Sequence, residues 1–391
     1  MKQVSEKTNW KGYAGLLVAF ILLGWTSSAA AGTVSDLARE RITLEFPGFV
    51  SEAELTYPAG EGGPFPAVLL IAGSGAADMD HTVVSPFEYG PTGPRVLSAN
   101  FRAIAEYFAQ RGFAVLRYNK RYVTGPGQAD YARFYQLTLH DLLADAETAL
   151  AALKAHPRVD PERIAVYGWS EGSTIAATLA AERSDIAALV LQTPVVYPWR
   201  ETFLYQIFEV SLPYVLRFLE DGYFTNNSIA RGMQGEGGMV AKSGLSYLVD
   251  PSYMTGLTVN RSLDADNDGR LHVGTELTMS SLAGVVDAAF APGGYFAMYA
   301  PGVALPTLGD RIGGFDMPAL ILQGGVDANV PPQGARILAE ALERAGGDVT
   351  LLFYPDLGHS LGEAGSVTLD NFQPIADEPL SDLAGWLSER L

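Results

Sequence analysis

The sequence predicts an α/β fold with a mostly parallel central sheet, helices on both faces and an inserted cap subdomain. From residue 67 onward, apolar runs typical of strands covered on both faces alternate with longer amphipathic patterns typical of helices. This alternation stops after Pro194 and resumes at Asp316. The interruption, of about 120 residues, is too long for a simple connection between strands. We therefore expect it to fold as a cap or lid.

The first two strands differ from the others. Residues 42–46 and 53–57 alternate apolar and polar side chains, which is the period of half-exposed antiparallel strands. The remaining predicted strands and helices are typical of strand–helix units that build a parallel sheet. The strands cover residues 67–71, 113–116, 164–167, 187–191, 319–322 and 349–354, and the helices cover 96–111, 137–155, 173–183, 334–345 and 379–391.

Composition excludes several classes of function. The 391 residues are 48% hydrophobic, an ordinary globular value, and include no cysteine, so disulfides, thiol catalysis and thiolate metal sites are absent. The formal net charge is −18. An acidic surface of this kind repels nucleic acid and anionic lipid, so we expect neither as a partner. A small neutral or apolar substrate suits it better.

The N-terminal segment is typical of a secretory signal. Lys2, Lys7 and Lys11 precede an apolar run at residues 13–25, and Ala29 and Ala31 form an A-x-A cleavage pattern. We expect cleavage after Ala31 and export to the periplasm or medium, with no membrane span in the mature chain; the alternative is an uncleaved anchor. The predicted organisation is a signal peptide at 1–31, core at 32–193, cap at 194–315 and core at 316–391.

One serine stands in the context that a nucleophile requires. The predicted strand 164–167 runs into Gly168-Trp169-Ser170-Glu171-Gly172, and a helix follows directly. This is the G-x-S-x-G elbow in its strand–turn–helix setting, which places the hydroxyl at a helix N-terminus. A second copy surrounds Ser360 at residues 358–362, but it follows Pro355-Asp356 and has no histidine after it. Ser170 is therefore the predicted nucleophile and Ser360 a decoy, the alternative for the first copy being an ordinary tight turn.

The base and the acid follow from position in the chain. A serine needs a base near neutral pH, and the five histidines are His81, His140, His156, His272 and His359. Only His359 follows the last predicted strand, in the order serine, acid, histidine. Asp327 is the one carboxylate in the turn after strand 319–322, where it would orient the imidazole, unless it is only a turn-forming residue.

The loop after strand 67–71 has the small residues of an oxyanion site. Ala72-Gly73-Ser74-Gly75 lets backbone amides approach a reacting carbonyl, and the Ser74 and Glu171 N–H groups are the predicted donors. The alternative is an ordinary glycine-rich turn. Arg117, Lys120 and Arg121 have the pattern of a structural charge cluster and not of catalytic residues.

These motifs together resemble the α/β-hydrolase superfamily, in particular its bacterial dienelactone-hydrolase-like and serine-aminopeptidase-like branches. The resemblance covers residues 42–195 and 315–391 and rests on the segments 70–75, 117–121, 167–172, 325–327 and 358–359. It implies an α/β-hydrolase fold with an inserted cap. In such families the loop often reads His-Gly, whereas here Ala72 stands in place of the histidine, which removes a side chain that can brace the loop.

An Asp-rich stretch in the predicted cap raises the question of a metal. Asp264, Asp266 and Asp268 are spaced like the start of a calcium loop, but Thr275 stands where the closing glutamate belongs and Glu276 follows it. We expect no cofactor for catalysis, and a structural Ca²⁺ here is an alternative to a plain Asx-rich turn.

The resulting expectation is a serine hydrolase that cleaves carboxylic esters through an acyl-enzyme on Ser170, His359 and Asp327. An exopeptidase or amidase of the same fold is the second hypothesis, in which cap acids bind a substrate amine; the candidates are Glu201, Glu209, Glu220 and Asp221. A catalytically inactive binding protein is the third. The filled triad positions argue against it.

Overall fold

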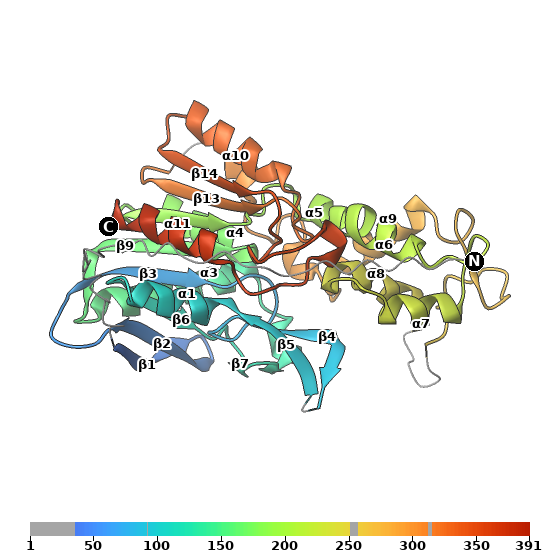
Figure 1. The fold of residues 1–391 in the computed structure, drawn as a ribbon, viewed down its shortest axis with the longest axis horizontal. Coiled ribbons are helices and arrows are strands. Elements are labelled where there is room, and N and C mark those ends of the chain that lie inside the picture. The colour runs from blue at the N-terminus through green and yellow to red at the C-terminus, as the bar shows by residue number, and fades with distance from the viewer. Residues whose placement is uncertain (1–35, 92, 251–256, 312–314) are drawn as a thin grey trace, which may run out of the picture. The chain divides into compact units, whose positions relative to one another are not determined.

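The computed structural model describes residues 36–391 apart from 92, 251–256 and 312–314 (Figure 1). The predicted signal peptide lies outside the described residues. Within them, the helices are too short or too polar for any of them to traverse a lipid bilayer.

A single large sheet forms the centre of the fold. Its strand order is β1-β2-β6-β3-β9-β10-β13-β14, with parallel pairing from β6 through β14 and antiparallel pairing of β1 with β2 and of β2 with β6. The strands are β1 Leu37–Phe46, β2 Phe49–Pro58, β3 Phe65–Ile71, β6 Ala114–Tyr118, β9 Val159–Trp169, β10 Ala188–Gln192, β13 Ala319–Gly324 and β14 Val349–Tyr354. The predicted α/β-hydrolase fold class and its two antiparallel leading strands are confirmed.

Helices cover both faces of this sheet, because its central strands are apolar on both sides. Helices α3 Leu139–Ala155, α4 Glu171–Ala181 and α10 Gln333–Arg344 share one hydrophobic cluster with the sheet. Helices α1 Asn100–Ala109 and α11 Asp377–Ser388 share the cluster on the opposite face. The carboxyl ends of the parallel strands therefore meet at one edge, which is where ligands bind in open α/β sheets.

The predicted helix over residues 96–111 is wrong at its start. Residues Gly93–Ala99 form strand β5, which pairs antiparallel with β4 Thr82–Gly90, and α1 begins only at Asn100. Ala99 has φ −141° and ψ 65°, outside the helical region. Pairing with the strand that directly precedes them decides the conformation of these residues, and the helical spacing from Val96 does not reveal it. A two-stranded sheet of β7 Val123–Gly125 and β8 Gln128–Ala129 and the short helix α2 Tyr131–Phe134 precede α3.

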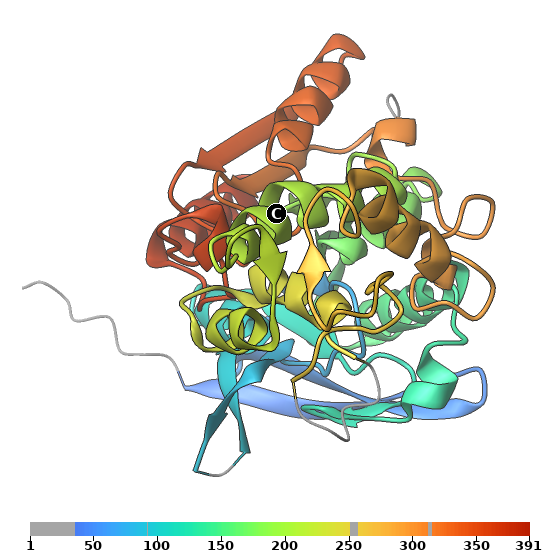
Figure 2. The same cartoon turned by 90° about the vertical axis from the view of Figure 1, so that its right-hand side faces the viewer.

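Most regular elements described between β10 and β13 are helices. Helix α5 Trp199–Tyr205 continues through the π-helical turn η1 Gln206–Ser211 into α6 Leu212–Leu216 (Figure 1). Short elements then follow to the start of β13; these are β11 Tyr223–Phe224, α7 Asn226–Gln234, α8 Met239–Leu248, β12 Leu271–His272, α9 Met279–Ala289, η2 Ala297–Tyr299 and η3 Leu308–Arg311. Figure 2 looks onto this segment, whose yellow-green to orange elements lie in front of the sheet.

Much of this segment has its own hydrophobic centre. Val210, Tyr214, Phe224 and Leu245 are fully buried in a cluster distinct from the two that flank the sheet. The segment also contacts the core directly, because the Tyr205 hydroxyl donates a hydrogen bond to the carbonyl oxygen of Asp327 at 2.6 Å. The domain boundaries at 193/194 and 315/316 stay a prediction.

Candidate active site

Ser170 lies at a sharp turn between β9 and α4. Its backbone has φ 55° and ψ −120°, a strained conformation for a residue with a side chain. The turn needs its two glycines: a Cβ on Gly168 would lie 2.2 Å from the carbonyl oxygen of Gly172, and one on Gly172 would lie 2.3 Å from that of Ile71. The G-x-S-x-G segment thus forms an elbow that presents the Ser170 side chain at the N-terminus of α4, where the helix dipole favours negative charge.

His359 and Asp327 are brought together at the same edge of the sheet. Asp327 follows β13 and His359 follows β14. The imidazole Nδ1 lies 2.9 Å from Asp327 Oδ2 and 3.0 Å from Oδ1, and both side chains are buried. Asp327 Oδ1 also accepts hydrogen bonds from the backbone amides of Asn329 at 2.7 Å and Val330 at 2.9 Å. The carboxylate therefore has a fixed orientation toward the imidazole.

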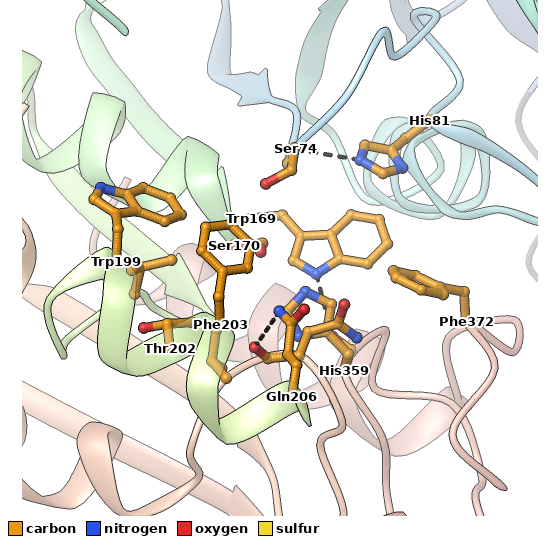
Figure 3. A pocket seen from close by; sticks show the side chains of 14 residues that line it. Ser74, His81, Trp169, Ser170, Trp199, Thr202, Phe203, Gln206, His359 and Phe372 are labelled. Carbon is orange, nitrogen blue, oxygen red and sulfur yellow. Dashed lines mark hydrogen bonds between the residues drawn. The ribbon is translucent and has the colours of Figure 1, made fainter. Parts of the chain in front are cut away.

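Ser170 and His359 line one cavity of about 170 Å³ (Figure 3). Helix α5 contributes Trp199 and Phe203 to its wall, and Phe372 contributes from the C-terminal part of the chain. The full lining is Gly73, Ser74, His81, Trp169, Ser170, Val195, Trp199, Thr202, Phe203, Gln206, Asn329, Val330, His359 and Phe372. None of these lining residues is a carboxylate. The wall thus combines aromatic and apolar side chains with polar ones, among them Thr202, Gln206 and Asn329.

The loop after β3 borders the serine as expected. A Cβ on Gly73 would lie 3.2 Å from the Cβ of Ser170, so glycine permits this close approach. The Gly73 N–H donates to His81 Nε2 at 3.2 Å. Within the described residues, the backbone N–H groups of Ser74 and Glu171 have no hydrogen-bond partner. Both predicted donors are therefore unpaired, as an oxyanion role would require, and that role stays a prediction.

His81 supplies the brace that Ala72 cannot. It reaches the loop from nine residues further along the chain and packs against Trp169, with ring centroids 4.2 Å apart. Burial, assisted by the nearby Lys120 cation, lowers the pKa of His81 to about 3. The imidazole is therefore neutral at pH 7, and its Nε2 is the acceptor because the Gly73 amide is the donor.

Lys120 and Glu171 form an ion pair that sequence reasoning missed. Lys120 Nζ donates to Glu171 Oε1 at 2.7 Å and also to the carbonyl oxygen of Gly73. Tyr299, from the inserted segment, donates its hydroxyl to Glu171 Oε2. All three side chains are buried. Lys120 thus joins the loop that carries Ser74 to the residue that carries the second amide.

The interpretation of Lys120 as part of a purely structural charge cluster is therefore incomplete. Its neighbours fit that interpretation, because Arg117 pairs with Glu54 and Asp80, and Arg121 pairs with Asp145. The signal for Lys120 was present in the sequence. A glutamate within the elbow, at the start of a buried helix, needs a cation close by.

The decoy serine lies away from the cavity. Ser360 is buried, and its hydroxyl donates to the carbonyl oxygen of Gln373 at 2.6 Å. The four acids of the exopeptidase hypothesis do not line the cavity either. Glu220 instead accepts hydrogen bonds from Thr225 at 2.7 Å and Asn227 at 2.6 Å.

The Asp-rich loop brings its three carboxylates together. Oxygen atoms of Asp264, Asp266 and Asp268 lie within 4.8 Å of one another. Glu276, however, accepts from the amides of Ala265 at 2.6 Å and His272 at 2.7 Å, so both of its oxygens hold the loop itself. The donor set fits a calcium ion only in part. Calcium binding stays a prediction.

Sequence comparison connects the chain with hydrolases. A family model described as "Serine aminopeptidase, S33" matches residues 96–260, which include Ser170 but not Asp327 or His359. Esterase EstD of Thermotoga maritima is 36% identical over 149 residues, 38% of this chain and 31% of EstD. Esterase FrsA of Escherichia coli O157:H7 is 27% identical over 179 residues, 43% of this chain and 37% of FrsA. The chain thus spans about a third of the length of these two relatives.

Among solved structures, one titled as a brefeldin A esterase, a bacterial homologue of human hormone sensitive lipase, aligns over 91% of this chain and 78% of its own. The identity is 16% and the TM-score 0.49.

Proposed function

Since this chain is a hydrolase of the α/β-hydrolase superfamily, we propose that it is a serine esterase that cleaves small neutral carboxylic esters through an acyl-enzyme on Ser170. The observation that carries the proposal is the cavity that is lined by both the elbow serine and His359, an imidazole whose Nδ1 is held by a buried carboxylate. The names of EstD and FrsA support an ester substrate.

Each residue of the site has a role in this reaction. The Ser170 hydroxyl oxygen attacks the ester carbonyl while His359 Nε2 takes its proton, and Asp327 stabilises the imidazolium that forms. The carbonyl oxygen becomes an oxyanion, which the Ser74 and Glu171 amides bind at the positive end of α4. The imidazolium then returns the proton to the departing alkoxide. Water attacks the acyl-enzyme with His359 again as base, which releases the acid and restores Ser170.

The cavity favours an ester over a peptide with a free amine. An aminopeptidase site needs an anion to bind the substrate ammonium group, and the described lining contains no carboxylate. Sites for drug-sized ligands measure roughly 300–1,000 Å³. The cavity of about 170 Å³, lined in part by Trp199 and Phe203, suits short acyl groups.

The test is kinetic. Ser170→Ala is compared with wild type on nitrophenyl acetate, butyrate and octanoate and on aminoacyl nitroanilides. Ser360→Ala is the matched control, because that serine lies outside the cavity. We expect Ser170→Ala to lose turnover by about 10⁶-fold, as for a triad nucleophile, and Ser360→Ala to keep it.

Each other outcome selects an alternative. Cleavage of the nitroanilides alone would replace the esterase with an exopeptidase. Absence of turnover on both classes, with the chain folded, would favour the inactive binding protein. Equal ester cleavage by Ser170→Ala and wild type would remove Ser170 from the mechanism.

We also propose that a signal peptidase cleaves the chain between residues 31 and 32 and that the protein is exported. The pattern of lysines, apolar run and A-x-A site supports this. N-terminal sequencing of the protein from cell fractions tests it. A first residue at position 32 in the exported fraction is expected, and an intact N-terminus in the membrane fraction would favour the anchor.

A further inference from the structure

A second buried carboxylate, Asp370, contacts both loops that carry the predicted acid and base. We call the turn after β13 that carries Asp327 the acid turn, and the loop after β14 that carries His359 the base loop. Its Oδ2 accepts a hydrogen bond from the backbone amide of His359 at 2.9 Å and another from that of Ala328 at 2.9 Å. Ala328 directly follows Asp327. One oxygen atom therefore holds the backbone of the base and the backbone next to the acid. Asp370 is 2% exposed.

The surrounding backbone is shaped to admit this carboxylate. A Cβ on Gly358, the residue before His359, would lie 2.1 Å from Asp370 Oδ1. Any side chain at position 358 would therefore displace Asp370 or the base loop. This contact explains why a glycine, and no residue with a side chain, precedes His359.

Asp370 belongs to a segment that the inserted helices hold in place. The carbonyl oxygen of Thr368 accepts from the Gly238 amide at 2.8 Å, and Asn371 Oδ1 accepts from the Met239 amide at 3.0 Å, both at the start of α8. Phe372, two residues after Asp370, lines the cavity beside the serine. The segment thus connects the insertion, the triad and the substrate cavity.

The ionised form of Asp370 is energetically unfavourable in its buried position. Burial, and then repulsion by Asp327, raises the pKa of Asp370 to about 6, while the two amides and His359 act in the opposite direction. Its Oδ1 has no hydrogen-bond partner. The titratable groups that interact with Asp370 are Asp327 on the acid turn, His359 on the base loop and Tyr205 on α5. If Asp370 only linked the acid turn to the base loop, the neutral side-chain amide of an asparagine could accept the same hydrogen bonds without burying a charge.

We propose that Asp370 is a positioning residue for the catalytic triad, which fixes the acid turn against the base loop and whose negative charge favours the imidazolium form of His359. Electrostatic coupling is reciprocal, so a carboxylate that His359 stabilises also stabilises protonated His359. The imidazolium is the form that accumulates in the transition state of each acyl-transfer step. This inference rests on the proposed function of Ser170, His359 and Asp327.

The test compares Asp370→Asn, which keeps an acceptor oxygen and loses the charge, with Asp370→Ala, which loses both. Asp356→Asn is the matched control, since it removes an exposed carboxylate from the same loop. Ester hydrolysis gives kcat, KM and the pH dependence of kcat/KM. Thermal unfolding, followed by tryptophan fluorescence, reports whether each variant is folded.

We expect Asp370→Ala to lower kcat by about 100-fold with KM within about threefold, because misplacement of a catalytic group by about 1 Å costs this much. Asp370→Asn should recover part of that loss. Its kcat/KM profile should retain activity to lower pH, by roughly half a unit, because the charge that favoured proton uptake by His359 is gone. The Asp356→Asn profile should match wild type.

Two results would overturn the inference. One is a wild-type kcat and pH profile in both Asp370 variants. The other is activity that falls only in proportion to the unfolded fraction, with no displacement of the profile. The Ser170→Ala variant is measured in parallel. If it retains ester cleavage, the proposed function fails; if it is inactive while the Asp370 variants behave as wild type, the positioning role alone fails.

Discussion

Replacement of Lys120 by methionine tests whether the buried ion pair behind the serine organises the oxyanion site. The substitution keeps most of the volume and removes the ammonium group that joins Glu171 to the Gly73 carbonyl. Glu171→Gln removes the opposite charge and keeps the backbone N–H of residue 171. The double variant removes both charges. Lys154→Met is the control, since Lys154 pairs with the partly exposed Asp185 at the surface.

The expected magnitudes follow from burial. The Glu171 side chain is 0% exposed and that of Lys120 4%, so each single substitution leaves a buried charge without its partner. Such a loss costs about 3–5 kcal/mol of unfolding free energy, against about 5–15 kcal/mol for a typical domain. The double variant should be at least as stable as either single one, which requires a coupling energy of at least about 3 kcal/mol. The control should lose less than about 1 kcal/mol.

Catalysis should respond differently from stability. Loss of one oxyanion donor costs about 10²–10³ in kcat, which is the upper limit if the Ser74 amide leaves its position. We expect Lys120→Met to lower kcat by about tenfold to 100-fold, and the double variant to regain stability without regaining kcat.

Urea unfolding and ester hydrolysis at 15 °C measure the two effects separately. Additive destabilisation by the single substitutions would contradict the coupling. A stable Lys120→Met variant with wild-type kcat would refute the organising role.

Three further predictions concern the acid, the cavity and pH. Asp327→Asn should lower kcat by about 10⁴-fold in ester hydrolysis near neutral pH, because it removes the charge that orients the imidazole; a loss below about tenfold would reassign the acid. Phe203→Ala should shift the preferred nitrophenyl ester from butyrate toward octanoate, since Phe203 lines the cavity and its truncation enlarges it; an unchanged chain-length profile would place the acyl group elsewhere. The folded-state pKa of Asp370 is raised from 3.8 to about 6, so its contribution to stability is fully present below pH 3.8 and is lost as pH rises through about 6. Asp370→Asn should therefore gain unfolding free energy over wild type between pH 5 and pH 8, by about 1.4 kcal/mol. Urea unfolding at the two pH values measures this gain, and a difference that stayed constant would contradict it.

The sequence was most informative where backbone geometry leaves one solution. Carbonyl oxygens lie so close to Gly168 and Gly172 that neither position admits a side chain. The G-x-S-x-G motif in its strand–helix context therefore predicts the elbow. Asp327 and His359 follow consecutive parallel strands, and chain order places both at the edge where Ser170 lies. The fold class follows from the same alternation of strands and helices.

The sequence was least informative where tertiary contacts decide. Strand β5 exists because the preceding strand β4 pairs with it, and the helical spacing from Val96 does not show that pairing. Asp370 stands in a segment without a periodic pattern, and its two amide contacts come from residues 11 and 42 positions away. His81 accepts a hydrogen bond from the Gly73 amide and has a left-handed backbone with φ 47°. No sequence motif predicts this contact.

The most direct test of the central claim is to locate the covalent adduct of a fluorophosphonate ester. The full chain is incubated with the probe near neutral pH and digested, and the modified peptide is identified by mass spectrometry. We predict a single adduct on Ser170, absent from Ser170→Ala and strongly reduced in His359→Ala. An adduct on Ser360, or an unmodified Ser170 in a preparation that hydrolyses esters, would contradict the account.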